Sequence, residues 1–203
     1  MRPSDAARLA RIAHASQLYG EAPYMTHVRD VVTRVIEDER ATTDAVVVAY
    51  LHDVLEDTGL GIHDLKSQGL SQRQTSALML LTRGESQPYA AYIDHICRDP
   101  LAALVKYHDC SSNLEAFPGP HPELEKSYVA AQPRLRDAAL GVTECSSCGA
   151  AIVFLKTTKG AWMPVDRGSL PTNFDIDQVF RPALGHVTHY ATCPNADEHR
   201  RRA

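Results

Sequence analysis

Residues 45–58, AVVVAYLHDVLEDT, join an apolar run to a cluster of ionisable side chains. The run is apolar except for the hydroxyl of Tyr50, and no Pro or Gly follows before Gly59, so its length favours a buried helix over a strand. Four ionisable residues end it: His52, Asp53, Glu56 and Asp57. On one continuous helix, His52 would share a face with Glu56, and Asp53 with Asp57. Such a cluster is unfavourable in a buried segment unless its charge is offset, and a divalent cation would offset it. The alternative is a solvated helix end.

Further polar side chains occur where helical periodicity predicts apolar ones. His27 opens a segment lined with valine, and Lys106 and Asp109 follow the apolar run 101–105. A lone histidine at a helix start is more often a cap or a satisfied core residue than a ligand. Together, however, two imidazoles and two carboxylates form a set suited to Mn²⁺, Fe²⁺ or Zn²⁺ with positions left open. These four residues are His27, His52, Asp53 and Asp109.

A second set of possible ligands lies near the C-terminus. Cys145 and Cys148 form a C-x-x-C pair, and His189 and Cys193 follow after short β-type segments. Three thiolates and one imidazole are the ligands of a closed structural zinc site. A redox pair or unliganded thiols are the alternative, and His186 competes with His189 as the fourth ligand.

Helical periodicity accounts for most of the chain up to residue 140. We expect helices over 5–18 and from Val28 to Ile36. The central stretch should form a helix capped by Asp44, and another helix should follow a cap at Ser71. Three further helices are expected. These are 89–96, 101–113 and 123–139. Loops are expected at 18–24 and at 59–69, the latter with a short helical turn.

The pattern changes after Gly141. Short β-type runs at 152–156, 179–181 and 186–190 are separated by Gly, Pro and Asp, and 157–160 is typical of a hairpin turn before a strand with Trp162. A segment this short with so few large apolar residues is commonly held together by a metal.

Composition excludes some classes of protein. The 203 residues carry a formal net charge of −4, which argues against a general nucleic-acid or membrane-surface binder. No apolar run approaches the roughly 20 residues of a transmembrane helix, and the N-terminus lacks the apolar region of a signal peptide. We therefore expect a cytoplasmic protein without membrane contacts, in which the C-x-x-C pair of Cys145 and Cys148 serves metal or redox chemistry before a structural disulfide.

Five segments in order resemble the HD-domain metal-dependent phosphohydrolases, and most closely the hydrolase domains of RelA/SpoT-type (p)ppGpp enzymes and the small alarmone hydrolases. They span about residues 5 to 135: AHASQ (13–17), PYMTH (23–27), YLHDVLEDT (50–58), LLTRG (80–84) and VKYHDCSSN (105–113).

This resemblance implies a role for each matching residue. The metal ligands would be His27, His52, Asp53 and Asp109, with Mn²⁺ preferred over Fe²⁺ or Zn²⁺. Glu56 and Asp57 match an acidic pair that assists the attacking water and the leaving group. Substrate contacts are expected from Asn113, Tyr24 and Lys106. The implied reaction removes pyrophosphate from a ribose 3′ position.

The chain departs from the family pattern around the nucleotide. The loop 18–22 is one residue short and lacks the family's arginine, Ser112 replaces a histidine, and Ala116 replaces a threonine. The set of expected metal ligands is intact, whereas the residues that hold the nucleotide differ. No synthetase domain fits after the helical segment, so we expect hydrolysis only.

We therefore predict a mainly α protein: an HD-domain helical bundle over 1–140, followed by a small β module over 141–203 that resembles zinc ribbons. The predicted function is hydrolysis of (p)ppGpp or a closely related nucleotide. Alternatives are hydrolysis of another phosphorylated nucleotide or an RNA 3′ end, or a metal-loaded sensor that docks a partner through the β module. That module would hold a structural Zn²⁺, and its basic residues could contact a protein or a nucleic acid.

Overall fold

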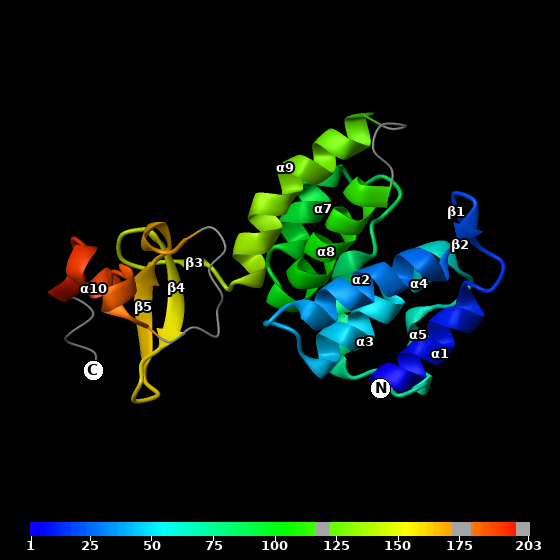
Figure 1. Ribbon diagram of the computed structural model, residues 1–203, viewed down its shortest axis with the longest axis horizontal. Helices are drawn as coiled ribbons and strands as arrows, with labels where there is room; N and C mark the ends of the chain where they lie inside the picture. Colours follow the sequence, from blue (N-terminus) through cyan, green and yellow to red (C-terminus); the bar gives the residue numbers. More distant parts are fainter. Residues whose placement is uncertain (117–121, 172–179, 198–203) are drawn as a thin grey trace. The chain divides into compact units, whose positions relative to one another are not determined.

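Helices form almost all of the first of two compact units in the computed structural model, which describes residues 1–116, 122–171 and 180–197. The units are Met1–Ala139 and Leu140–Ala203. Figure 1 shows helices in the first and a small sheet in the second. The prediction of a mainly helical protein with a β-type C-terminal part is confirmed.

The described helices of the first unit follow one another with short connections. They are α1 (Pro3–Ala13), α2 (Met25–Glu37), α3 (Thr43–Leu51), α4 (Val54–Asp57), α5 (Ile62–Ser67), α6 (Gln72–Leu81), α7 (Tyr89–Ile96), α8 (Pro100–Ala116) and α9 (Pro122–Ala139). Between α1 and α2, the expected loop contains a small antiparallel hairpin of β1 (Leu18–Tyr19) and β2 (Ala22–Pro23).

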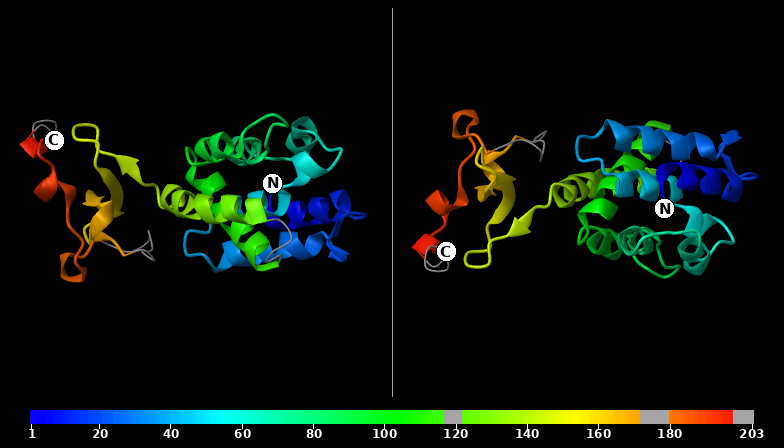
Figure 2. Two further views of the ribbon diagram at one scale, coloured as in Figure 1. Left: turned by 90° about the horizontal axis from the view of Figure 1, so that it is seen from above. Right: turned by 90° about the horizontal axis from the view of Figure 1, so that it is seen from below.

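Helix α3 lies at the centre of the apolar core. It packs against α1, α2, α6 and α8, and the views of Figure 2 show α1 and α3 running side by side. Val47, Val48, Ala49 and Leu51 are fully buried. A helix that is apolar on all sides is stable only when other helices surround it, and this arrangement brings the end of α3 into the interior.

The central stretch is not one continuous helix, so that prediction is wrong. Helix α3 ends at Leu51, and after two turn residues α4 begins at Val54. The Ala49 carbonyl accepts a hydrogen bond from His52 Nδ1 at 2.8 Å, and the Asp53 carbonyl accepts from the Asp57 N–H at 2.9 Å, which starts a new turn. Burial of the His52 ring favours this break over continued helical pairing.

Two helix caps were predicted, and one of them is wrong. Ser71 caps α6, since its hydroxyl accepts from Gln74 N–H at 3.1 Å, as predicted. Thr42, and not Asp44, caps α3 by accepting from Ala45 N–H at 3.1 Å. Asp44 is already inside the helix, where its carboxylate accepts from Gln74 Nε2 at 2.8 Å.

The second unit is built on a three-stranded antiparallel sheet. Its strands are β3 (Thr143–Glu144), β4 (Ala151–Lys156) and β5 (Trp162–Asp166), in the order β3-β4-β5. The predicted turn at 157–160 joins β4 to β5, and Gly160 takes the positive φ of 82° that this turn needs. Its apolar core is small and consists of five buried residues: Leu140, Val153, Leu155, Val165 and Leu170.

The predicted strand over 186–190 is wrong. Thr188 makes only an isolated bridge to Val165, and the chain then enters the short helix α10 (His189–Thr192). Two 3₁₀ turns precede it, Arg167–Ser169 and Pro182–Leu184. Of the run predicted over 179–181, Val179 lies outside the described residues, and Phe180 donates its N–H to the Lys156 carbonyl at 2.8 Å without forming a strand.

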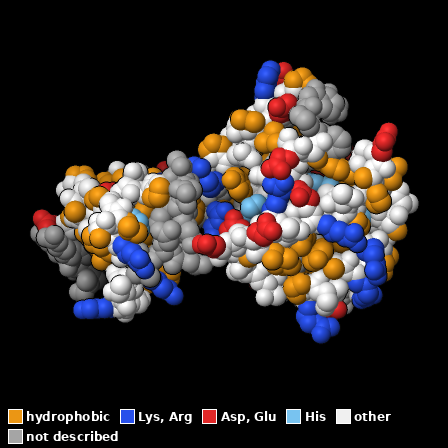
Figure 3. All heavy atoms as spheres, viewed as in Figure 1, with side chains coloured by type: hydrophobic (Ala, Val, Ile, Leu, Met, Phe, Trp, Pro, Cys, Tyr) orange, Lys and Arg blue, Asp and Glu red, His pale blue; other side chains and the backbone are white. Residues whose placement is uncertain are grey.

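Within the described residues, no helix has the length and apolarity needed to cross a membrane. On the face of the first unit drawn in Figure 3, acidic and basic side chains both occur among apolar ones.

Candidate metal centres and active site

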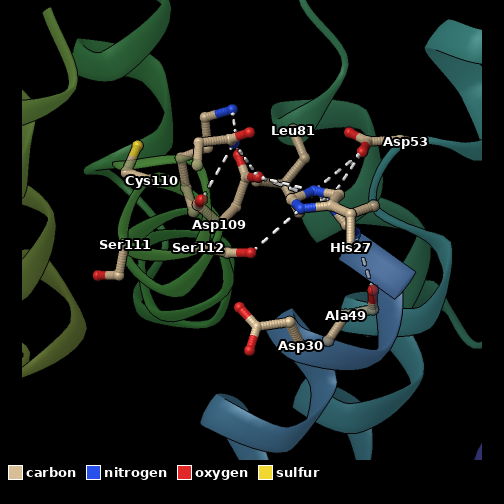
Figure 4. A network of polar contacts seen from close by, with 12 residues as sticks. His27, Asp30, Ala49, Asp53, Leu81, Asp109, Cys110, Ser111 and Ser112 are labelled. Atoms are coloured by element: carbon tan, nitrogen blue, oxygen red, sulfur yellow. Dashed lines mark hydrogen bonds and ion pairs between the residues drawn. The ribbon is translucent and has the colours of Figure 1, made fainter. Parts of the chain in front are cut away.

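Four predicted ligands meet in the interior of the first unit. His27 comes from α2, His52 and Asp53 from the break between α3 and α4, and Asp109 from α8. His27 Nε2 lies 3.3 Å from His52 Nε2 and 3.2 Å from Asp109 Oδ1. Asp53 Oδ2 lies 2.9 Å from His52 Nε2 and 3.7 Å from His27 Nε2. Figure 4 shows His27, Asp53 and Asp109 converging on this point.

The outer nitrogen of each imidazole is hydrogen-bonded, which leaves the inner one free to bind a metal. His52 Nδ1 faces the Ala49 carbonyl at 2.8 Å and must donate, because a carbonyl only accepts. His27 Nδ1 lies 3.2 Å from the hydroxyl of Ser112. Hydrogen bonds of this kind fix the ring orientation and the tautomer of metal-binding histidines. Both Nε2 lone pairs therefore face the carboxylates.

Charged and polar neighbours keep the carboxylates ionised. Burial would raise the pKa of Asp109, but the ammonium of Lys106, whose Nζ donates to Oδ2 at 2.7 Å, and the two histidines hold that pKa well below its usual range. Asn113 Nδ2 also donates to Asp109 Oδ1 at 2.8 Å. The pKa of Asp53 is lowered in the same way against its burial, chiefly by His52.

This donor set fits a divalent transition metal. The facing atoms of His27, His52 and Asp109 all lie within 4.8 Å of one another, and the contacts of Asp53 with both imidazoles add it to the group. Lone pairs of nitrogen and oxygen that face each other at these distances repel unless a proton or a cation lies between them. Imidazole and carboxylate ligands suit Mn²⁺, Fe²⁺ or Zn²⁺.

Glu56 and Asp57 lie on α4 next to this centre, and both are exposed. Asp57 Oδ2 accepts from Gln17 Nε2 at 2.9 Å, and Glu56 Oε1 accepts from the Arg83 backbone N–H. Glu56 is exposed, but its carboxyl is partly desolvated, and this desolvation raises its pKa; the hydrogen bond from Arg83 opposes the rise. The acidic pair thus borders the metal cluster without being part of it.

The three residues that were predicted to contact the substrate lie at the same place, but each bonds to a carboxylate of this cluster. Tyr24 donates its hydroxyl to Asp53 Oδ2 at 2.6 Å. Lys106 and Asn113 both donate to Asp109. Burial and the nearby Asp53 raise the pKa of Tyr24, so its hydroxyl stays a donor. In this structure the three side chains orient the carboxylates.

Several contacts of the site were not predicted from the sequence. Tyr19, on the β1–β2 hairpin, stacks on the ring of His27 with centroids 4.7 Å apart, and its hydroxyl donates to Asn113 Oδ1 at 2.7 Å. It lies in the loop where the family pattern has an arginine. His14, Gln17 and Ser112 also contact the site. The first two lie in AHASQ, one of the segments that carry the family resemblance, and that match was the only signal for them in the sequence.

The second set of predicted ligands meets in the second unit. Ligand atoms of Cys145, Cys148, His189 and Cys193 all lie within 4.8 Å of one another, and Cys148 Sγ is 3.3 Å from His189 Nε2. The turn between the first two cysteines is closed by the Gly149 N–H, which donates to the Cys145 carbonyl at 2.8 Å. Hydrogen bonds from Ser147 lower the pKa of Cys145 to about 5, which favours the thiolate that zinc binds.

Asp166 supports this cluster from outside and was missed in the sequence. His189 Nδ1 donates to Asp166 Oδ1 at 2.6 Å, and Thr192 donates to Oδ2 at 2.6 Å. A carboxylate behind a histidine is typical of zinc sites. The competing His186 lies elsewhere: its Nδ1 accepts from Arg181 N–H at 3.1 Å. Three thiols and one oriented imidazole fit a tetrahedral Zn²⁺.

Comparisons with known proteins support the helical fold. No family model matches the chain, and no curated protein matches its sequence. Among solved structures, it is similar to one described as a metazoan ortholog of SpoT that hydrolyzes ppGpp, with a TM-score of 0.58 and 20% sequence identity. The match covers 67% of this chain and 86% of that one. Over the matched part, this protein therefore has the fold of that hydrolase.

Proposed function

We propose that the first unit is a metal-dependent phosphohydrolase that removes the 3′-pyrophosphate of (p)ppGpp or a closely related nucleotide. The observation that carries this proposal is the convergence of two imidazoles and two carboxylates beside the acidic pair Glu56 and Asp57. A binding module would need the metal ligands but not two exposed carboxylates beside them. The similar fold of a ppGpp hydrolase agrees with this proposal.

The metal would be held by His27, His52, Asp53 and Asp109. A bound Mn²⁺ would lower the pKa of water toward about 7 and polarise a phosphoryl oxygen. The chain's own contribution is to fix the ligands: Ser112 and the Ala49 carbonyl hold the two rings. Tyr24, Lys106 and Asn113 hold the two carboxylates.

Proton transfer falls to the acidic pair. Asp57, held by Gln17, orients the attacking water and accepts its proton at a carboxylate oxygen. Glu56 has a raised pKa, so it keeps a larger protonated fraction near neutral pH than an ordinary glutamate and can give its proton to the leaving oxygen.

A related substrate other than (p)ppGpp is the second candidate, and Tyr19 favours it. The loop that carries an arginine in the family pattern here carries Tyr19, whose ring stacks on His27. A neutral tyrosine lacks the charge and the bidentate donors with which an arginine binds a phosphate, but its ring can pack against a base or a sugar. Another phosphorylated nucleotide or an RNA 3′ end would then be the substrate of the same centre.

The test is to incubate the full-length Mn²⁺-loaded protein with ppGpp, pppGpp, NADPH and 3′-phosphorylated nucleotides and to identify the products. We expect release of pyrophosphate from a 3′ position. Asp53→Ala should lose both metal and activity, whereas Glu56→Gln should lose activity and keep the metal. The proposal fails if no nucleotide is hydrolysed, or if Asp53→Ala retains its metal.

In the second unit, we propose a structural zinc ion bound by Cys145, Cys148, His189 and Cys193. The unit's apolar core is small, so the metal would supply much of its folding free energy. The role of this unit would be to contact a protein or a nucleic acid, and not to perform catalysis.

A further inference from the structure

His14 is a buried histidine that the proposed chemistry does not use. His14 is the residue directly after α1, and it is 2% exposed. Its Nδ1 lies 2.7 Å from Gln17 Oε1, while its Nε2 is buried and has no hydrogen-bond partner among the residues that the structure describes. A polar ring is buried at such a cost only where its remaining contact matters.

The direction of the hydrogen bonds is fixed by Asp57. An ionised carboxylate only accepts, so Gln17 turns its Nε2 toward Asp57 Oδ2, at 2.9 Å. This orientation leaves Gln17 Oε1 facing His14, and Oε1 only accepts. His14 Nδ1 must therefore carry the hydrogen, and Nε2 is then the bare nitrogen, which is the less costly one to leave unpaired. The result is a directed chain from His14 through Gln17 to Asp57.

Backbone hydrogen bonds hold the first two residues of this chain, His14 and Gln17. Gln17 N–H donates to the His14 carbonyl at 3.2 Å, and the Gln17 carbonyl accepts from Tyr24 N–H at 3.0 Å. The His14 ring is also stacked on the Tyr24 ring, with centroids 4.7 Å apart. Asp57, in contrast, is exposed on the four-residue helix α4. Gln17 donates to its carboxylate, and the Tyr24 hydroxyl also interacts with it, so Gln17 fixes one side of a carboxylate that is otherwise open to solvent.

We propose that His14 and Gln17 are positioning residues that set the orientation of the Asp57 carboxylate. This inference rests on the proposed function, because Asp57 must orient the attacking water there. His14 acts through Gln17, to which its Nδ1 is hydrogen-bonded. The competing explanation is that His14 acts only by packing on Tyr24, whose hydroxyl bonds to Asp53.

Two substitutions of His14 separate the hydrogen bond from the packing. His14→Phe keeps an aromatic ring on Tyr24 and loses the donor, whereas His14→Asn loses the ring but carries an amide N–H close to the position of Nδ1. We expect His14→Phe to lower kcat about tenfold with KM little changed, as for loss of one oriented hydrogen bond. His14→Asn should recover most of that rate. Equal losses in both variants, or a loss only in His14→Asn, would assign His14 to packing.

A second background tests whether the effect passes through Asp57. In an Asp57→Asn protein whose metal content has been checked, His14→Phe should cause no further loss of the residual rate, because coupled residues are not additive. A full tenfold loss in that background would overturn the proposal.

A spectroscopic measurement tests the hydrogen bonds from His14 to Asp57 without any assay of activity. In the metal-free full-length protein, hydrogen exchange of the Gln17 side-chain amide should be slowed in wild type and His14→Asn and fast in His14→Phe. Identical exchange in all three overturns the chain of hydrogen bonds. If wild type hydrolyses no nucleotide while exchange follows this pattern, the proposed reaction is wrong and the positioning of Asp57 stands.

Discussion

The hydroxyl of Ser112 fixes the orientation of His27 in the cluster of possible metal ligands. Ser112 lies between His27 and Asp30: its hydroxyl faces His27 Nδ1 at 3.2 Å, and its hydrogen bond helps to lower the pKa of Asp30 against the effect of partial burial. In the family pattern a histidine takes this position. A serine that bonds a carboxylate can accept from the imidazole, which keeps Nε2 unprotonated and able to bind a metal.

Replacement of Ser112 should therefore weaken metal binding. We expect Ser112→Ala to lower Mn²⁺ affinity about tenfold, as is common for residues behind a ligand, with titration calorimetry as the measurement. Ser111 is a matched control on the same helix, as Figure 4 shows. Its hydroxyl donates to the Tyr107 carbonyl at 2.9 Å, away from the cluster. Equal losses in Ser111→Ala and Ser112→Ala would show a general effect on α8.

The raised pKa of Glu56 predicts a feature of the pH profile. If Glu56 gives a proton to the leaving oxygen, kcat falls as pH rises through a pKa above the ordinary value near 4.5, because the carboxyl loses that proton. Glu56→Gln should remove this descending limb and lower kcat by about 10²–10⁴. Metal content is the control for an intact site. A descending limb that survives in Glu56→Gln would assign the proton to another group.

At the scale of elements, a partly buried carboxylate ties the end of α2 to α8. Asp38 accepts from His108 Nε2 at 2.9 Å and from Arg40 Nε at 2.7 Å. Burial would raise the pKa of Asp38, but Arg40 and His108 hold it well below its usual range. Since α2 carries His27 and α8 carries Asp109, this contact also helps to fix the relative position of two proposed ligands.

Asp38→Asn should lower the free energy of unfolding by about 1–3 kcal/mol at neutral pH, because it removes a partly buried charge-assisted contact. A group with a lowered folded-state pKa stabilises the fold above its unfolded pKa, near 4, and this contribution is lost as pH falls further. The difference between wild type and Asp38→Asn should therefore shrink below about pH 4. Urea unfolding, monitored by circular dichroism at neutral pH and below about pH 4, measures the difference in unfolding free energy and its dependence on pH.

Asp94→Asn is the control for this prediction. Asp94 pairs with Arg134 at the surface, and both side chains are at least half exposed. Exposed pairs contribute little to stability, so this variant should unfold like wild type. If the two variants behave alike, the Asp38 contact has no special role.

The whole molecule contains two clusters of possible ligands, one in each unit, and their chemistry differs. Imidazole and carboxylate groups accept Mn²⁺ or Fe²⁺, whereas thiolates select zinc. We therefore expect elemental analysis to find zinc in the second unit and a metal that varies with growth conditions in the first.

Cys148→Ser should release the zinc and unfold the second unit, because metal binding supplies much of its folding free energy. The helical unit should keep its own cooperative melt and its hydrolase activity. Calorimetry and zinc analysis of the full chain are the measurements, with Cys97→Ser as the control, since Cys97 lies outside both clusters. A truncated chain of residues 1–140 should also stay active. Loss of activity in a folded truncation would show that the second unit helps to form the active site.

The sequence alone was enough to predict a mainly helical chain, most helix positions, the change of structure near residue 140 and the two groups of possible ligands. The spacing of apolar residues indicates which face of a helix is buried, and the type of a polar residue indicates which metals it can bind. Both are local properties of the sequence. Their roles as ligands remain predictions, although the structure brings each group together. Only the tertiary structure showed the break after Leu51, the cap at Thr42 and the short helix at His189, because each depends on contacts with other elements. The same holds for Ser112, which meets His27 across 85 residues of chain, and for the link from His14 to Asp57. Such partners are selected by the packing of helices, and no local pattern in the chain records them.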